Sequence, residues 1–181
     1  MRFFKIIQAG GFPGTGTLHE WLLLSSAFSC CLLFARILVT GTFTFIFLPW
    51  NLFLAFIPYW IARWIISSAP IIKDRVKLAI ALLIWLLFIP NSFYIITDLF
   101  HLDRFPSAPR WFDLLLIFSF AWNGIICGVI SLRKVELVIR KLKGKNFSIL
   151  MVFAVMFLSA LGIYIGRFLR FKSWDIITDA V

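Results

Sequence analysis

Five long stretches of apolar residues restrict the fold of this chain more than any other feature of its sequence. Each is close to the ~20 residues that a helix needs to cross the hydrocarbon core of a bilayer. The stretches are 21–39, 41–62, 78–97, 114–132 and 147–166. Only the first contains a charged residue, Arg36. The sequence therefore predicts an all-α integral membrane protein, a bundle of about five transmembrane helices that forms a single domain over residues 1–181.

The overall composition excludes the other fold classes. Apolar residues make up 62% of the chain and charged residues make up 14%. In a soluble domain, about 45–50% of residues are apolar and about 25% are charged. A chain this apolar has too few polar groups to cover the surface of a soluble globule. Disorder is excluded because aromatic residues alone make up 18% of the sequence.

The first apolar stretch has two interpretations. Arg2 and Lys5 precede it and small residues surround Cys30, as in a secretory signal sequence. However, apolar residues continue beyond Cys30, and no A-x-A cleavage site follows. We interpret 21–39 as a retained helix, with a cleaved signal sequence as the alternative.

The net charge of +10 is unevenly distributed between the connections. Twelve of the eighteen Lys and Arg residues lie on one side of the predicted membrane, in segments 1–20, 63–77 and 133–145. With three acidic residues, that side has a net charge of +9, and the other side has +1. The positive-inside rule then predicts a cytoplasmic N-terminus and an outer C-terminus, in the cell (inner or cytoplasmic) membrane. The charge sets orientation, so we predict no nucleic-acid partner.

Lipid and protein partners are predicted from two further patterns. The basic segment 133–145 is expected to lie on anionic lipid, at about 1 kcal/mol per basic residue. Small residues four apart, at Gly124 and Gly128 and at Gly162 and Gly166, are typical of helix-packing faces. They favour a homo-oligomer or another membrane protein as partner.

Three asparagines, Asn51, Asn91 and Asn123, interrupt apolar stretches at comparable depth. An amide that faces lipid leaves its donors and acceptor unsatisfied, so these side chains should face the bundle interior. We favour simple interhelical hydrogen bonding, at ~0.6 kcal/mol per pair. The alternative is a polar layer that binds substrate.

The segment 90–103 carries the candidate catalytic residues. Pro90 predicts a kink or break in the helix. If the helix resumes, Asn91, Tyr94, Asp98 and His101 lie on one face. Asp98 and His101 would form an acid–base pair, and Asn91 and Tyr94 would contact substrate. Alternatively, Asp98 caps a helix and His101 lies among headgroups. We predict no metal ion and no cofactor, because no metal-ligand spacing occurs.

The last segment, 162–176, adds Arg167, Arg170, Trp174 and Asp175 on the same predicted outer side. Arginine binds carboxylate or phosphate in a bidentate manner, so these residues are candidate substrate contacts. The alternatives are arginines that reach lipid phosphates, or ion pairs of Arg167 or Arg170 with Asp98 or Asp113.

Two sequence strings resemble a known family. They are P-N-x-x-Y-x-x-T-D-x-x-H-L in 90–102 and G-R-F-x-R-x-x-S-W-D in 166–175. Together they resemble an uncharacterised bacterial family of multi-pass membrane proteins, a domain of unknown function. The resemblance implies a bacterial membrane protein and no particular activity. It also implies a C-terminal truncation at Val181, because relatives often continue into another apolar segment.

Three functions follow as hypotheses. The first is a membrane enzyme with an Asp/His/Arg site at the outer interface. The second is a small oligomeric permease subunit that uses the asparagine layer at a broken helix. The third is a structural or assembly protein whose polar clusters hold its own helices together. We favour the enzyme because an acid, an imidazole and two arginines lie on one side.

Overall fold

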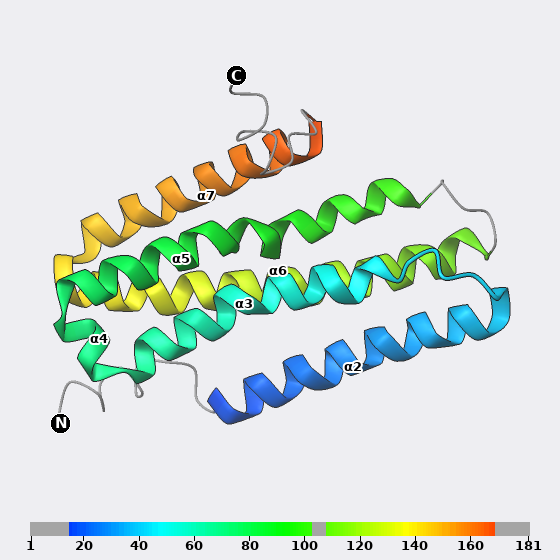
Figure 1. The fold of residues 1–181 in the computed structure, drawn as a ribbon, viewed down its shortest axis with the longest axis horizontal. Coiled ribbons are helices and arrows are strands. Elements are labelled where there is room, and N and C mark those ends of the chain that lie inside the picture. Colours follow the sequence, from blue (N-terminus) through cyan, green and yellow to red (C-terminus); the bar gives the residue numbers. More distant parts are fainter. Residues whose placement is uncertain (1–14, 103–107, 169–181) are drawn as a thin grey trace, which may run out of the picture.

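The computed structural model describes residues 15–102 and 108–168, and these are almost entirely helical (Figure 1). Side chains are described for residues 18–102 and 108–166. The helices, in chain order, are α2 (Thr15–Thr40), α3 (Phe47–Ser67), α4 (Ala69–Lys73), α5 (Arg75–Tyr94), the 3₁₀ helix η1 (Ile95–His101), α6 (Arg110–Lys143) and α7 (Lys145–Phe168). No strand occurs within the described ranges.

Four helical segments are long and apolar enough to cross a bilayer. They are Leu18–Thr40, Arg75–His101, Arg110–Lys143 and Lys145–Gly166. These segments contain four of the five predicted stretches, and they indicate a multi-pass membrane protein.

The remaining predicted stretch, 41–62, corresponds to α3, which is not among these four segments. Residues 41–46 connect α2 to α3, with Gly41 at φ 64°, so α3 begins later than the hydropathy suggested. α3 also carries Asn51, Pro58 and Arg63 within its length. It packs mainly against α5 and α6, so many of its side chains contact protein.

The predicted basic loop 133–145 is helical. α6 continues to Lys143, and α7 begins at Lys145 after Gly144, whose φ is 92°. The helix continues because Val135, Val138 and Ile139 recur at helical spacing and are buried. With 34 residues, α6 is about 51 Å long, which exceeds the ~30 Å of the hydrocarbon core.

Basic residues gather at one end of the bundle, which we call the basic end. It contains the α3–α4–α5 connection and the turn between α6 and α7 (Figure 1). Here Asp74 caps α5, because its Oδ1 accepts hydrogen bonds from the backbone N–H groups of Val76 (3.0 Å) and Lys77 (3.2 Å). The bond from Lys77, followed by that from Val76, lowers the pKa of the Asp74 carboxyl below its ordinary value. The α2–α3 connection, the end of η1 and the start of α6 lie at the opposite end (Figure 1).

Small residues let three helices approach closely in the interior. Ser92 Oγ of α5 donates to the Ala55 carbonyl of α3 at 3.0 Å. A Cβ placed on Gly124 of α6 would lie 2.5 Å from Ile95 Cγ2, and one on Gly128 would lie 2.8 Å from Ser92 Cβ. The Gly124–Gly128 face therefore packs against α5 and η1 of the same chain.

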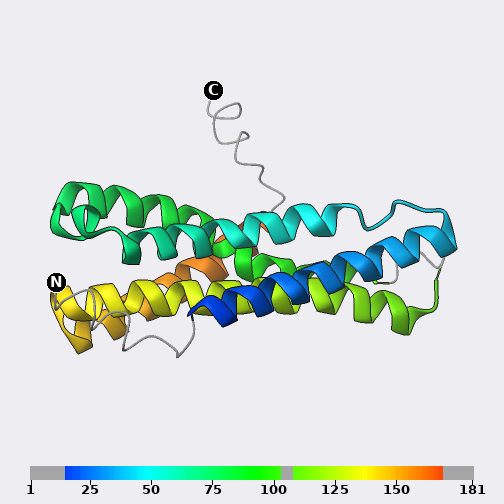
Figure 2. The same ribbon diagram turned by 90° about the horizontal axis from the view of Figure 1, so that it is seen from below.

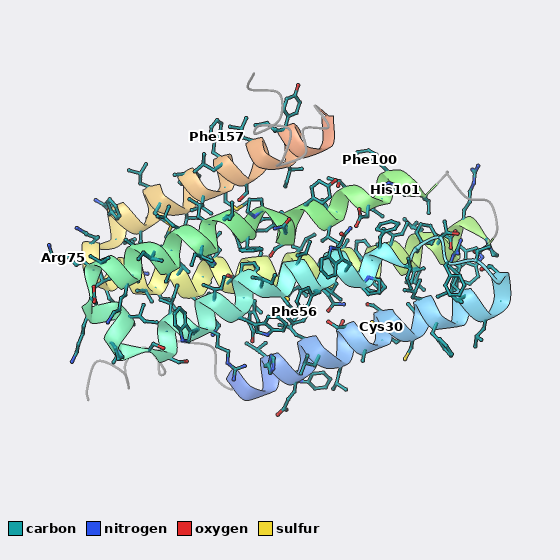
Figure 3. The ribbon with its side chains drawn as sticks, viewed as in Figure 1. Cys30, Phe56, Arg75, Phe100, His101 and Phe157 are labelled. Atoms are coloured by element: carbon teal, nitrogen blue, oxygen red, sulfur yellow. The ribbon has the colours of Figure 1, made fainter. Side chains whose placement is uncertain are left out.

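The exterior of the bundle is largely apolar, as a bilayer requires. α3 and α6 run side by side, and α2 lies along the half away from the basic end (Figure 2). Only 11% of the apolar segment of α7 is buried within the bundle. Its Phe157 points away from the bundle (Figure 3). These exposed side chains form the surface that lipid would cover.

Candidate functional site

The helix changes type just before the candidate catalytic residues. α5 continues through Pro90 to Tyr94, and η1 then follows from Ile95 to His101. A 3₁₀ helix has three residues per turn, so Asp98 and His101 lie on the same side of η1. Asn91 and Tyr94 belong to α5, so Asp98 and His101 are the two members of the predicted face that lie within η1. They lie at the end of the bundle opposite Arg75 (Figure 3).

Asp98 is a buried carboxyl group, only 2% exposed. Asn51 of α3 donates its Nδ2–H to Asp98 Oδ2 at 2.8 Å. A carboxylate in an apolar bundle needs hydrogen-bond donors to offset its lost hydration. The Asn51 bond meets part of that need and joins α3 to η1.

His101 lies beside Phe47, with ring centroids 5.4 Å apart. Its Nδ1 is buried and has no hydrogen-bond partner within the described part of the chain. Buried polar atoms without partners are exceptions that need an explanation. This nitrogen is free to bond a substrate or water that enters the site. We call Asn51, Asp98 and His101 the η1 site.

The other two asparagines bond elsewhere. Asn91 Nδ2 donates to the Phe88 carbonyl of its own helix at 3.2 Å. Asn123 Nδ2 donates to Ser29 Oγ at 3.2 Å and to the Ser119 carbonyl at 2.9 Å, which joins α6 to α2. The hydrogen bonds seen between described residues thus give each asparagine a different partner.

The structure describes only a small part of the predicted arginine site. Arg167 belongs to α7, but its side chain lies outside the described residues, as do Arg170, Trp174 and Asp175. The preceding residue, Gly166, faces Tyr94, because a Cβ built on Gly166 would lie 4.0 Å from Tyr94 Cε2. The end of α7 therefore runs beside the end of α5, next to the start of η1.

A second buried polar cluster was missed by the sequence reasoning. Arg36 of α2 forms an ion pair with Asp113 of α6, with Nε–Oδ1 at 2.6 Å and Nη2–Oδ2 at 3.2 Å. Nη1 also donates to Thr42 Oγ1 at 3.0 Å. The structure pairs Asp113 with Arg36, whereas the sequence suggested Arg167 or Arg170 as its partner. The available signal was that Arg36, inside the first apolar stretch, and Asp113, just before the fourth, lie on the same predicted side.

An aromatic series connects this ion pair to the η1 site. The Arg36 guanidinium lies 4.5 Å from the centre of the Phe45 ring. The Phe45 and Phe47 rings are 6.1 Å apart, and Phe47 packs on His101. The α2–α3 connection is therefore held at one end by Arg36 and packs against the η1 site at the other.

The η1 site has the chemistry of proton transfer. A carboxylate and an imidazole one turn apart can exchange a proton with a bound group. Within the described ranges, no three His, Cys, Asp or Glu side chains gather closely enough to hold a metal ion.

Comparison with known proteins gives a family and no activity. No curated protein matches the chain, and no solved structure matches it either. A family model does match, over a region that includes Asn51, Asp98 and His101 and excludes Arg36. That model, "Protein of unknown function (DUF1361)", covers residues 50–181, well over half of the sequence, so the chain belongs to this family.

Proposed function

We propose that this protein is a membrane enzyme that transfers protons at the η1 site to an anionic or lipid-linked substrate. One observation carries the proposal. A buried carboxyl group, Asp98, lies one 3₁₀ turn from His101, whose buried Nδ1 lacks a partner in the described chain. Ionisable residues at membrane depth are costly and usually functional.

The orientation follows from the basic end. We propose that this end faces the cytoplasm, by the positive-inside rule. α3 then acts as the fifth membrane-spanning helix, the N-terminus is cytoplasmic and the C-terminus lies outside. The η1 site, at the opposite end, would meet substrate at the outer interface of a bacterial inner membrane.

Each residue of the site has a distinct proposed role. Asp98 and His101 exchange the proton, and Asn51 orients the Asp98 carboxyl through its 2.8 Å bond. Tyr94 and Asn91 line the approach, with Arg167 and Arg170 as the groups that would hold the anion. The proximity of Gly166 to Tyr94 supports this role for the end of α7.

The other hypotheses receive less support. The asparagines bond to separate partners, so a continuous polar path for a permease has no observation in its favour. The Gly124–Gly128 face packs within the chain, so it offers no surface to an assembly partner.

Mass spectrometry of lipid extracts tests the proposal. Membranes that contain the wild-type chain should change in the abundance of at least one anionic lipid or lipid-linked species, relative to membranes without the chain. Asp98→Asn and His101→Gln should abolish the change. The matched controls are Asp74→Asn and His19→Gln, which make the same substitutions at the aspartate that caps α5 and at the other histidine.

Size-exclusion profiles and circular dichroism establish that each variant is folded. A folded Asp98→Asn variant that alters lipids as the wild type does would contradict the proposal. The same holds if the wild-type chain changes no lipid species.

A further inference from the structure

A groove of about 360 Å³ lies between α6 and α7 near the basic end, far from the η1 site. Its apolar lining comes from both helices, and consists of Val129, Leu132, Ile149, Val152 and Phe153. Two charged residues of α6, Arg133 and Glu136, complete the lining. The groove therefore combines a mostly apolar lining with one charged region.

The position of Arg133 along α6 matches a membrane boundary. Arg110 begins α6, and the exposed Trp111 is typical of an interfacial residue. From Arg110 to Arg133 the helix rises by about 35 Å, slightly more than the ~30 Å hydrocarbon core. With Arg110 at one boundary, Arg133 lies at the headgroup level of the other leaflet, and the apolar lining extends from it toward the hydrocarbon.

The charge at this level favours an anion. Arg133 is 48% exposed in its side chain and donates from Nη1 to Glu136 Oε2. Glu136 is the one acidic residue in 133–145, against six Lys and Arg residues. Basic pockets between membrane helices on the cytoplasmic side are typical sites for anionic headgroups.

We propose that this groove binds one anionic diacyl phospholipid, with an acyl chain along the apolar lining and the phosphate at Arg133. Lipid tails are as apolar as leucine, so burying the tail in the groove gives little preference among lipids. Selectivity for an anionic headgroup must therefore come from the positive charge of Arg133, which the carboxylate of Glu136 opposes.

Native mass spectrometry of the full chain in detergent tests the proposal. The probes are phosphatidylglycerol and phosphatidylcholine with identical acyl chains. We expect tighter binding of one phosphatidylglycerol molecule. Arg133→Gln should weaken that binding about fivefold, the effect of one basic residue at an anionic surface. Glu136→Gln should strengthen it, because it removes the negative charge that competes for Arg133.

Matched controls separate the groove from the general surface. Arg140→Gln removes an exposed charge of α6 outside the groove lining, and should leave the binding of this one lipid within twofold. Val152→Trp should fill the groove and abolish binding, whereas Leu150→Trp, at an exposed α7 position outside the lining, should not.

Three results would overturn the proposal. One is equal affinity for the two lipids. Another is equal effects of Arg133→Gln and Arg140→Gln. The third is unchanged lipid binding in a folded Val152→Trp variant. The two charge variants act in opposite directions, so a general loss of folding cannot imitate the expected pattern.

Discussion

Arg36 and Asp98 keep charge inside the bundle in two different ways. Arg36 is met by both oxygens of Asp113, by Thr42 and by the Phe45 ring, so the pair is closely matched. Asp98 accepts a bond from the Asn51 amide, and the nearby His101 has an Nδ1 that is unpartnered within the described chain. At this scale the first cluster stabilises the fold, and the second is the proposed site of chemistry.

Arg36→Met is expected to destabilise the protein because it leaves the buried Asp113 without its cation. Loss of one partner of a buried ion pair costs about 3–5 kcal/mol. Thermal unfolding in detergent should show a large decrease in Tm, which Arg36→Met combined with Asp113→Leu should largely reverse. Arg140→Met is the control, since Arg140 is exposed. Equal Tm values for the two single variants would contradict a stabilising role for Arg36.

At the scale of the element, the position of η1 depends on Gly124. Ile95, the first residue of η1, is fully buried, and its Cγ2 occupies the space that a side chain at position 124 would need. η1 therefore lies close against α6, and this contact sets where Asp98 and His101 are held.

Gly124→Ala should lower the stability by about 1–3 kcal/mol, the usual cost of overpacking a core. Its Cβ would lie 2.5 Å from Ile95 Cγ2. Gly166→Ala is the matched control on α7, where the nearest atom is 4.0 Å away. There the better helix propensity of alanine should preserve or slightly raise the stability. Tryptophan fluorescence during heating measures both, and a Gly124→Ala variant as stable as Gly166→Ala would refute the packing argument.

The elements also show what a sequence can predict. Hydropathy predicted the long helices, because an uncharged apolar run of about 20 residues is typical of a transmembrane helix. An indole N–H buried at membrane depth needs a partner, and Trp85 Nε1 donates to Ser131 Oγ at 2.7 Å. The helical end of α6 was missed, because its basic residues suggested a loop although the apolar spacing was helical.

Other features of the site were beyond sequence reasoning. Arg36 and Asp113 are 77 positions apart, and nothing local to either indicates the other. The change from α to 3₁₀ geometry at Ile95 depends on tertiary packing, so the spacing of Tyr94, Asp98 and His101 could not predict it.

At the scale of the whole molecule, the distribution of charge and the length of α6 support the same proposed orientation in the membrane. The basic residues gather where α6 extends beyond membrane thickness, and the buried Asp98 and Asp113 lie toward the opposite end. This asymmetry gives the bundle one proposed orientation in the membrane and places the η1 site and the α6–α7 groove in different leaflets.

Cysteine labelling tests the orientation. In a variant that lacks Cys30, Cys31 and Cys127, a single cysteine replaces Arg110 or Lys143, both exposed and both basic. A membrane-impermeant maleimide added to intact cells should label the Arg110→Cys variant. It should label Lys143→Cys only after the membrane is permeabilised. The reverse pattern would show that the basic end faces outward.

The central claim is that a ligand bonds the buried Nδ1 of His101 in the η1 site. An experimental density map of the full chain purified from native membranes tests it most directly. We predict non-protein density within about 2.7–3.2 Å of His101 Nδ1, next to Asp98. A map in which another residue of the chain occupies that position and bonds Nδ1 would contradict the claim.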